Sequence, residues 1–253
     1  MKFSFVSIFP VILFVSSAFL SSCGLIATHS LERADQTTTS LNLSRKNLET
    51  IPDKVYTLKN LKELRLYKNN IKEVPSRIME LENLEKLYLG KNQITKLPEE
   101  ITELKNLHTL SVPFNDLEEL PENINKLENL EFLILDQNNL TQLPESLGEI
   151  KQLKTITVSF NEIDTLQPKL FESGSIQELD LSYNLIKHIP DEISNLRNLH
   201  QLNLNNAGYL LRLPESMCEL RRIDLIVVDP SIIVPHCMLI KRNINTRIIQ
   251  RTN

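Results

Sequence analysis

Several features common in catalytic or nucleic-acid-binding chains are absent from this sequence. Tryptophan does not occur, glycine occurs five times in 253 residues, and no low-complexity tract is present. The chain carries no HExxH, P-loop, GxSxG or CxxC motif, which argues against the enzyme classes that these motifs define. The formal net charge is −4, so the overall balance gives no reason to expect a nucleic acid or an anionic membrane surface as a partner.

The sequence does contain one 23-residue unit, repeated along most of its length. The clearest copy is residues 84–106, LEKLYLGKNQITKLPEEITELKN, and the next copy follows in the same phase. In this phase eight units cover residues 38–222, seven of 23 residues and the last of 24. A period of about 20–29 residues with the pattern LxxLxLxxN is the sequence signature of a leucine-rich repeat (LRR) solenoid, in which each unit contacts only its neighbours.

The pattern within each unit predicts its local structure. The LxL segment alternates inner leucines with outward residues, as in a short strand, and the LPxxIxxL segment that follows suggests a short helical turn. We therefore expect an α/β fold, a horseshoe-shaped LRR solenoid of about eight repeats, with a parallel concave β-sheet and short helical turns on the convex side. The extra residue of the eighth unit predicts a bulged loop at Gly208, and residues 223–253 are expected to form a C-terminal cap and tail.

One asparagine recurs at the ninth position of six successive units. The strand must bend into the interior at this point, where backbone groups cannot reach water. An amide side chain both donates and accepts hydrogen bonds, so a ladder of asparagines satisfies these groups. The predicted structural ladder consists of Asn69, Asn92, Asn115, Asn138, Asn161 and Asn184.

The N-terminus has the features of an export signal. Lys2 precedes an apolar run at 3–20, and small residues lead to Cys23, as in a secretory signal peptide. The LSSC segment ending at Cys23 resembles the bacterial lipobox, which implies a signal peptide at 1–22, a lipidated Cys23 and a tether at 23–37. Attached acyl chains would hold the protein to a membrane. The alternatives are a secreted protein without lipid and a short membrane-spanning segment.

The cysteines and histidines offer few candidates for chemistry. Cys218 and Cys237 lie on either side of the predicted cap, where export permits a disulfide and two buried, unpaired thiols are the alternative. The five histidines do not cluster in the sequence. His108 and His200 share one column of the repeat, but they are four units apart, about 19 Å at strand spacing, too far to share a metal. We expect no metal, no cofactor and no catalytic residue.

The outward positions of the predicted sheet carry more aromatic residues than a solvated surface requires. The candidate ligand-binding residues of the concave face are Arg65, Tyr67, Tyr88, Phe114, Phe132, Ile134, Phe160 and Tyr183. The N-terminal units add the cations Arg45, Lys68, Lys86 and Lys91, and the C-terminal units add the polar residues Asp180, Asn203, Asn205 and Asn206. Aromatic and arginine side chains dominate the energetics of interfaces. The alternative is that the phenylalanines pack sideways on their neighbours within the fold.

The unit LxxLxLxxNxIxxLPxxIxxLxN resembles the 23-residue repeat of bacterial LRR proteins, and with the lipobox the chain resembles the exported LRR lipoproteins of spirochaetes. The resemblance implies a non-enzymatic, lipid-anchored protein–protein interaction module at the outer membrane or cell surface, which adheres to or captures a protein ligand such as a host molecule. The alternative function is a periplasmic structural or assembly scaffold of the cell envelope. LRR folds serve many unrelated tasks, so the repeat alone does not identify the ligand.

Overall fold

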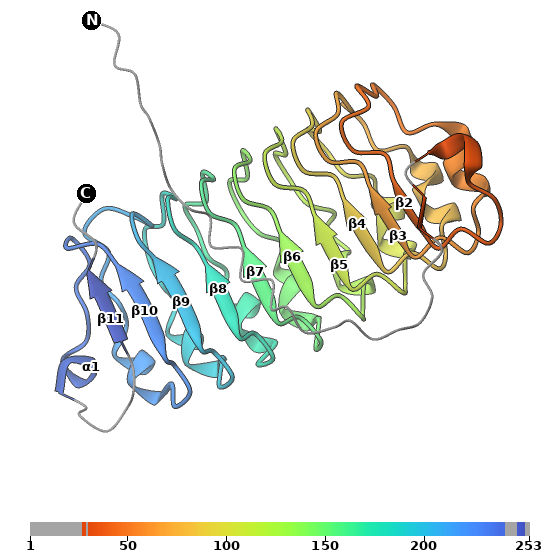
Figure 1. Ribbon diagram of the computed structural model, residues 1–253. Helices are drawn as coiled ribbons and strands as arrows, with labels where there is room; N and C mark the ends of the chain where they lie inside the picture. Colours follow the sequence, from red (N-terminus) through yellow and green to blue (C-terminus); the bar gives the residue numbers. More distant parts are fainter. Residues whose placement is uncertain (1–26, 29, 241–246, 251–253) are drawn as a thin grey trace, which may run out of the picture.

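The computed structural model describes residues 27–28, 30–240 and 247–250 (Figure 1). The predicted signal peptide and Cys23 lie outside the described residues. Within them, one sheet has 11 strands in chain order, and every neighbouring pair is parallel. The strands are β1 (Ala27–Thr28), β2 (Ser40–Asn42), β3 (Glu63–Arg65), β4 (Lys86–Tyr88), β5 (Thr109–Ser111), β6 (Phe132–Ile134), β7 (Thr155–Thr157), β8 (Glu178–Asp180), β9 (Gln201–Leu204), β10 (Leu225–Val228) and β11 (Arg247–Gln250).

The 23-residue period sets the register of the sheet. Leu64 pairs with Leu87, and Leu87 pairs with Leu110, so equivalent leucines stack in a column and are fully buried. Between β9 and β10 the register step is 24 residues, as in the pair Gln201 and Leu225. The additional residue lies in the loop after β9, where a Cβ atom on Gly208 would come within 1.9 Å of the Ile186 carbonyl oxygen. The predicted LRR solenoid is thus confirmed, and the expected bulge lies where the sequence placed it.

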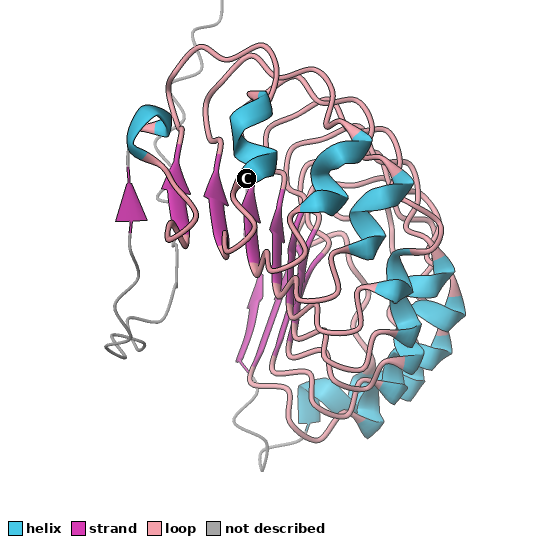
Figure 2. Ribbon diagram, turned by 90° about the vertical axis from the view of Figure 1, so that its right-hand side faces the viewer, coloured by secondary structure: helices cyan, strands magenta, loops and turns pink. Residues whose placement is uncertain are grey.

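Short helical turns cover the side opposite the sheet (Figure 2). They are 3₁₀ helices, and their apolar residues are buried against the strands, as Ile101 is in η4. A proline in extended conformation precedes most of them, and Pro168 itself begins η7. The turns of the repeats are η2 (Asp53–Thr57), η3 (Ser76–Glu80), η4 (Glu99–Glu103), η5 (Ile124–Lys126), η6 (Glu145–Glu149), η7 (Pro168–Glu172), η8 (Asp191–Asn195) and η9 (Glu215–Glu219).

Both ends of the repeat array are covered. The predicted tether at 23–37 contributes structure of its own, because β1 pairs with β2 and is followed by η1 (Leu31–Arg33) and the buried Ala34. At the other end, β10, the short helix α1 (His236–Ile240) and β11 continue the solenoid beyond residue 222. No helix within the described ranges has the length and apolarity needed to cross a bilayer.

Candidate binding face

The asparagine ladder fixes the carboxyl-terminal end of each strand. The Oδ1 atom of Asn115 accepts a hydrogen bond from the backbone N–H of Ile94 at 3.0 Å. Its Nδ2 atom donates to the carbonyl oxygens of Leu89 at 3.1 Å and Val112 at 3.2 Å. Each of the five other ladder asparagines makes the equivalent contacts within its own repeat and to the preceding one. Each amide therefore fastens its own turn to the preceding repeat.

The eighth residue of each of the eight units lies on a line along one edge of the concave sheet, which we call the edge row. Its members are Arg45, Lys68, Lys91, Phe114, Gln137, Phe160, Tyr183 and Asn206, and their φ angles lie between 53° and 59°. The backbone N–H of Lys68 donates to the carbonyl oxygen of Gly90 at 2.8 Å, and that of Phe160 donates to Ser182 at 3.0 Å. Such bonds between successive repeats hold the row in register with the sheet.

Left-handed backbone favours glycine, asparagine and aspartate, and costs other residues about 1–2 kcal/mol each. Only Asn206 in the edge row is of a favoured type. The turn geometry therefore does not explain the large cationic and aromatic side chains at the other positions. This feature is not evident from the sequence, because arginine, lysine and phenylalanine are not residues that signal a left-handed turn.

The predicted ligand-binding residues fall into two neighbouring lines on the concave side. Arg65, Tyr88, Phe132 and Ile134 project from strands β3, β4 and β6. The remaining four lie directly after the strands, in or beside the edge row: Tyr67, Phe114, Phe160 and Tyr183. The structure thus assembles all eight on one face, distributed along the array from the second to the seventh repeat.

Cations and aromatic rings alternate at the N-terminal part of this face. The Nζ atom of Lys91 lies 5.8 Å from the ring centre of Tyr67 and 4.9 Å from that of Phe114. The guanidinium of Arg65 lies 5.3 Å from the ring centre of Tyr88 and also forms an ion pair with Glu63. The two ring contacts of Lys91 orient its ammonium group without neutralising it, whereas Arg65 is paired with Glu63.

The middle of the face exposes aromatic surface. Phe160 and Tyr183 stack with ring centres 4.0 Å apart and an angle of 7° between the rings. Sideways packing therefore accounts for one side of Phe160, yet this residue remains 48% exposed, and Phe132 is 39% exposed. The stacked pair of Phe160 and Tyr183 on a rigid sheet offers a ligand apolar area whose rotamer entropy is already restricted.

Acidic residues lie further along the face. Asp136 accepts hydrogen bonds from the side chain and backbone of Ser159 and from the Thr157 hydroxyl. Burial raises the pKa of Asp136, and these hydrogen bonds only partly oppose the effect. At Asp229 burial would also raise the pKa, but hydrogen bonds from Ser231 and from the Asn206 backbone N–H outweigh it and leave the pKa lowered.

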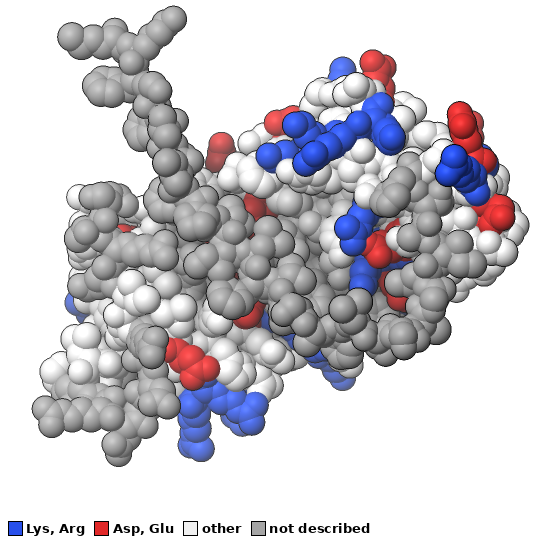
Figure 3. All heavy atoms as spheres, in the orientation of Figure 1, with Lys and Arg blue, Asp and Glu red and all other residues white. Residues whose placement is uncertain are grey.

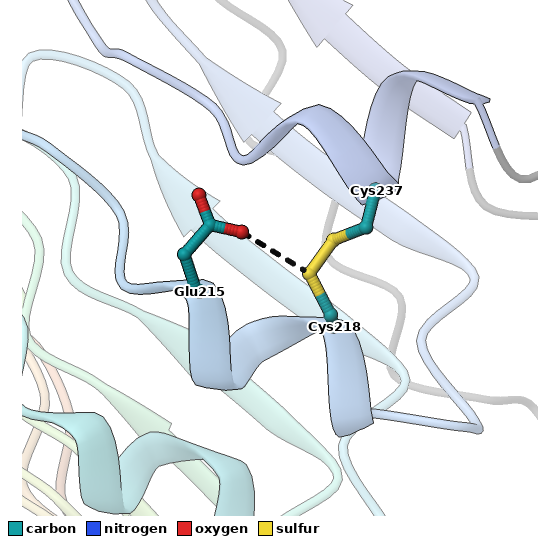
Figure 4. Close-up of side chains that lie close together, drawn as sticks. All are labelled: Glu215, Cys218 and Cys237. Atoms are coloured by element: carbon teal, nitrogen blue, oxygen red, sulfur yellow. Dashed lines mark hydrogen bonds between the residues drawn. A yellow bond between two sulfur atoms is a disulfide. The ribbon is translucent and has the colours of Figure 1, made fainter.

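Cys218 and Cys237 are joined by a disulfide bond that ties η9 to α1, with their Cα atoms 6.0 Å apart (Figure 4). Glu215 Oε2 lies 3.8 Å from Cys218 Sγ. Within the described ranges, these three residues are the group whose ligand atoms lie close enough to hold a metal ion. Both sulfur atoms are committed to the disulfide, so the group does not form a metal site.

The comparisons with known proteins agree with this geometry. A profile described as "Leucine rich repeat" matches residues 36–94 and 151–207, and one described as "Leucine-rich repeat region" matches residues 86–173. A comparison with curated proteins found no match. The repeat profiles and the parallel solenoid define the chain as a leucine-rich repeat protein.

Solved LRR structures superpose on most of the chain. An internalin from Listeria monocytogenes has a TM-score of 0.74 at 20% identity, covering 86% of this chain and 62% of the internalin chain. An LRR protein of Leptospira interrogans has a TM-score of 0.61 at 25% identity, covering 86% and 67%. The plant peptide hormone receptor RGFR1, solved in complex with RGF2, has a TM-score of 0.71 at 24% identity, covering 84% and 37%. The matched region is therefore less than two thirds of the internalin and receptor chains.

Proposed function

We propose that this protein is a non-enzymatic interaction module, anchored to a membrane by lipid on Cys23, that binds a protein ligand on its concave face. The observation that carries the proposal is the exposed aromatic surface of Phe132 and Phe160 in the middle of that face. The fold does not need these rings, because its core is complete in the stacked leucine columns beneath them. Aromatic residues on a rigid surface are typical anchors of protein interfaces.

The LRR architecture supports this proposal at the level of class. LRR domains are typically protein–protein interaction modules, and the plant peptide hormone receptor described above was solved in complex with RGF2. The lipobox resemblance at Cys23 supports anchoring, and we place the protein at the outer membrane or the cell surface. A ligand-capture or adhesion role follows from a binding face held at a membrane.

Site-specific photo-crosslinking in the living cell tests the binding face. A benzoylphenylalanine residue would replace Phe114 or Phe160 on the concave side, and Glu192 in η8 on the convex side would serve as the matched control. We expect a covalent adduct with another protein from the two concave positions and none from the control. Adducts formed equally from both sides, or from Glu192 alone, would contradict the proposal.

Protease treatment of intact cells tests the location, with a periplasmic protein as control. We expect this protein to be degraded while the control survives. Survival of the protein until the envelope is opened would instead favour the periplasmic scaffold. Substitution of Cys23 by serine should release the chain from the membrane fraction, and retention there would contradict the lipid anchor.

A further inference from the structure

The first three members of the edge row form a line of cations that the fold does not neutralise. Eleven ion pairs occur among the described residues, and none of them includes Arg45, Lys68 or Lys91. Lys62, at the opposite edge of the sheet, differs because it reaches Glu85 at 2.8 Å. The positive charge of the line is therefore available to a ligand.

The backbone holds these cations at fixed spacing. The Arg45 N–H donates to the Tyr67 carbonyl oxygen at 2.9 Å, and the Lys91 N–H donates to the Pro113 carbonyl oxygen at 2.9 Å. Successive members are thus about 4.8 Å apart, and the three span about 10 Å. Figure 3 shows Lys and Arg side chains gathered along the upper rim of the molecule. The row begins at a shallow depression lined by Asn42, Ser44, Arg45, Lys46 and Tyr67.

The rest of the row sets the character of the ligand. After Lys91 it continues with Phe114, Gln137, Phe160 and Tyr183. The charged side chains beside this second part are acidic, with Asp136 after β6 and Asp180 in β8. A polymer carrying negative charge along its whole length would meet repulsion there. A chain with acidic residues at one end and apolar residues after them matches both parts.

We propose, on the basis of the function proposed above, that the partner presents an extended acidic peptide segment to this row. Its carboxylates bind Arg45, Lys68 and Lys91, and the apolar residues that follow cover Phe114 and the stacked pair of Phe160 and Tyr183. The row from Arg45 to Tyr183 contains six repeat steps, about 29 Å, which corresponds to roughly nine residues of extended peptide. The segment therefore runs across the strands, along the axis of the solenoid.

A peptide selection with three variants tests the inference. The probe is a phage-displayed library of random peptides of about 12 residues, selected in parallel on the purified, detergent-solubilised protein and on each variant. The charge variant is Lys68→Glu with Lys91→Glu, and the aromatic variant is Phe114→Ala with Phe160→Ala. The matched control is Lys151→Glu with Arg197→Glu, which makes the same charge change in the exposed turns before β7 and β9.

We expect enriched peptides to carry clustered aspartate or glutamate followed by apolar residues. They should bind the wild type and the matched control with equal affinity. Their affinity for the charge variant should be lower by a factor of about ten or more. Raising the NaCl concentration from about 50 mM to about 500 mM should weaken binding, because surface charges are then screened.

The contrary outcomes separate this inference from the function on which it rests. Peptides without acidic enrichment that lose affinity only for the aromatic variant would overturn the acidic segment and leave concave-face binding intact. Peptides that bind every variant equally, or a selection that enriches none, would overturn both. A heparin fragment that binds the wild type but not the charge variant, without enrichment of acidic peptides, would replace the peptide with a sulfated polysaccharide.

Discussion

Asn115 shows how one amide side chain holds two neighbouring repeats together. Replacing it with alanine leaves the Ile94 N–H and the Leu89 carbonyl oxygen without their buried partner. We expect Asn115→Ala to lower the free energy of unfolding by about 1–3 kcal/mol. Asn139→Ala is the control, because Asn139 is an exposed neighbour of the ladder, and it should change stability by less than about 0.5 kcal/mol. Urea denaturation compares the two, and equal midpoints would contradict the role of the ladder.

Asp136 gives the molecule a pH dependence of predictable sign. Burial raises the pKa of Asp136 above its value of 3.8 in an unfolded chain, and the charge of Asp180 adds to the effect. The folded protein then binds more protons than the unfolded chain as the pH falls through the raised pKa, so this residue contributes more favourably at lower pH. Relative to Asp136→Asn, the wild type should therefore gain stability as the pH falls from about 7 to about 4.

Asp164 is the matched control, with the opposite sign. A hydrogen bond from Lys187 lowers the pKa of this exposed carboxyl group. Its contribution is present above the unfolded pKa of 3.8 and is lost as the pH falls through that value toward the lowered pKa. The wild type should therefore lose stability relative to Asp164→Asn as the pH falls from about 5 to about 3. Urea denaturation at several pH values measures both differences. A parallel response of the two variants would contradict the assignment at Asp136.

Single residues differ in how well the sequence predicts them. The asparagine ladder was predictable because one residue type recurs at a fixed period with hydrogen-bonding capacity on both sides. The left-handed backbone of Lys68 and Phe114 was not, because neither residue type favours that conformation. The hydrogen bonds between Asp136 and the hydroxyls of Thr157 and Ser159 join different repeats, and the repeat pattern does not specify which polar residues meet.

At the scale of elements, the disulfide between Cys218 and Cys237 connects the last repeat to α1. Its two cysteines are 19 residues apart, and closing a loop of this size stabilises a protein by about 3 kcal/mol. In a solenoid each unit depends on its neighbours, so the loss should act first on the C-terminal end. We expect Cys218→Ser with Cys237→Ser to make residues 223–240 the first site of proteolytic cleavage.

Limited proteolysis followed by mass spectrometry locates that cleavage. The wild type treated with a reducing agent should give the same fragments as the double variant, whereas the untreated wild type should resist cleavage longer. Identical digestion of all three samples would show that packing alone holds the cap.

The elements of the repeats follow from the sequence more directly than those at the ends. Strands and turns were predictable because the spacing of apolar residues changes from two to three within each unit, and the expected helical turns are 3₁₀ helices. Strand β1 was not predictable, since two residues carry no alternation, and the free edge of β2 supplies its partner. In the sixth unit, Ser173 stands where the neighbouring units have Ile150 and Leu196, and Phe171, two residues before it, is fully buried.

At the scale of the whole molecule, the solenoid separates a buried core from a binding face. Leu133 on β6 is fully buried between Leu110 and Ile156 of the neighbouring strands, whereas the adjacent Phe132 points outward and is 39% exposed. This alternation allows the outward residues to change without affecting the core. A ligand surface can therefore vary from repeat to repeat on a constant scaffold.

Single substitutions in the core and on the binding face test whether the two are energetically separate. Leu133→Ala should lower the free energy of unfolding by about 2–5 kcal/mol, because it opens a cavity in a packed column. Phe114→Ala and Phe160→Ala should each lower it by less than about 1.5 kcal/mol, since the loss is confined to ring contacts such as the stack with Tyr183. Denaturation of the three variants should show that Leu133→Ala reduces stability most. Crosslinking through benzoylphenylalanine at position 132, a concave position that none of the three substitutions affects, should show that the phenylalanine variants form less adduct. A phenylalanine variant as unstable as Leu133→Ala would mean that these rings belong to the core, and the binding role assigned to them would fail.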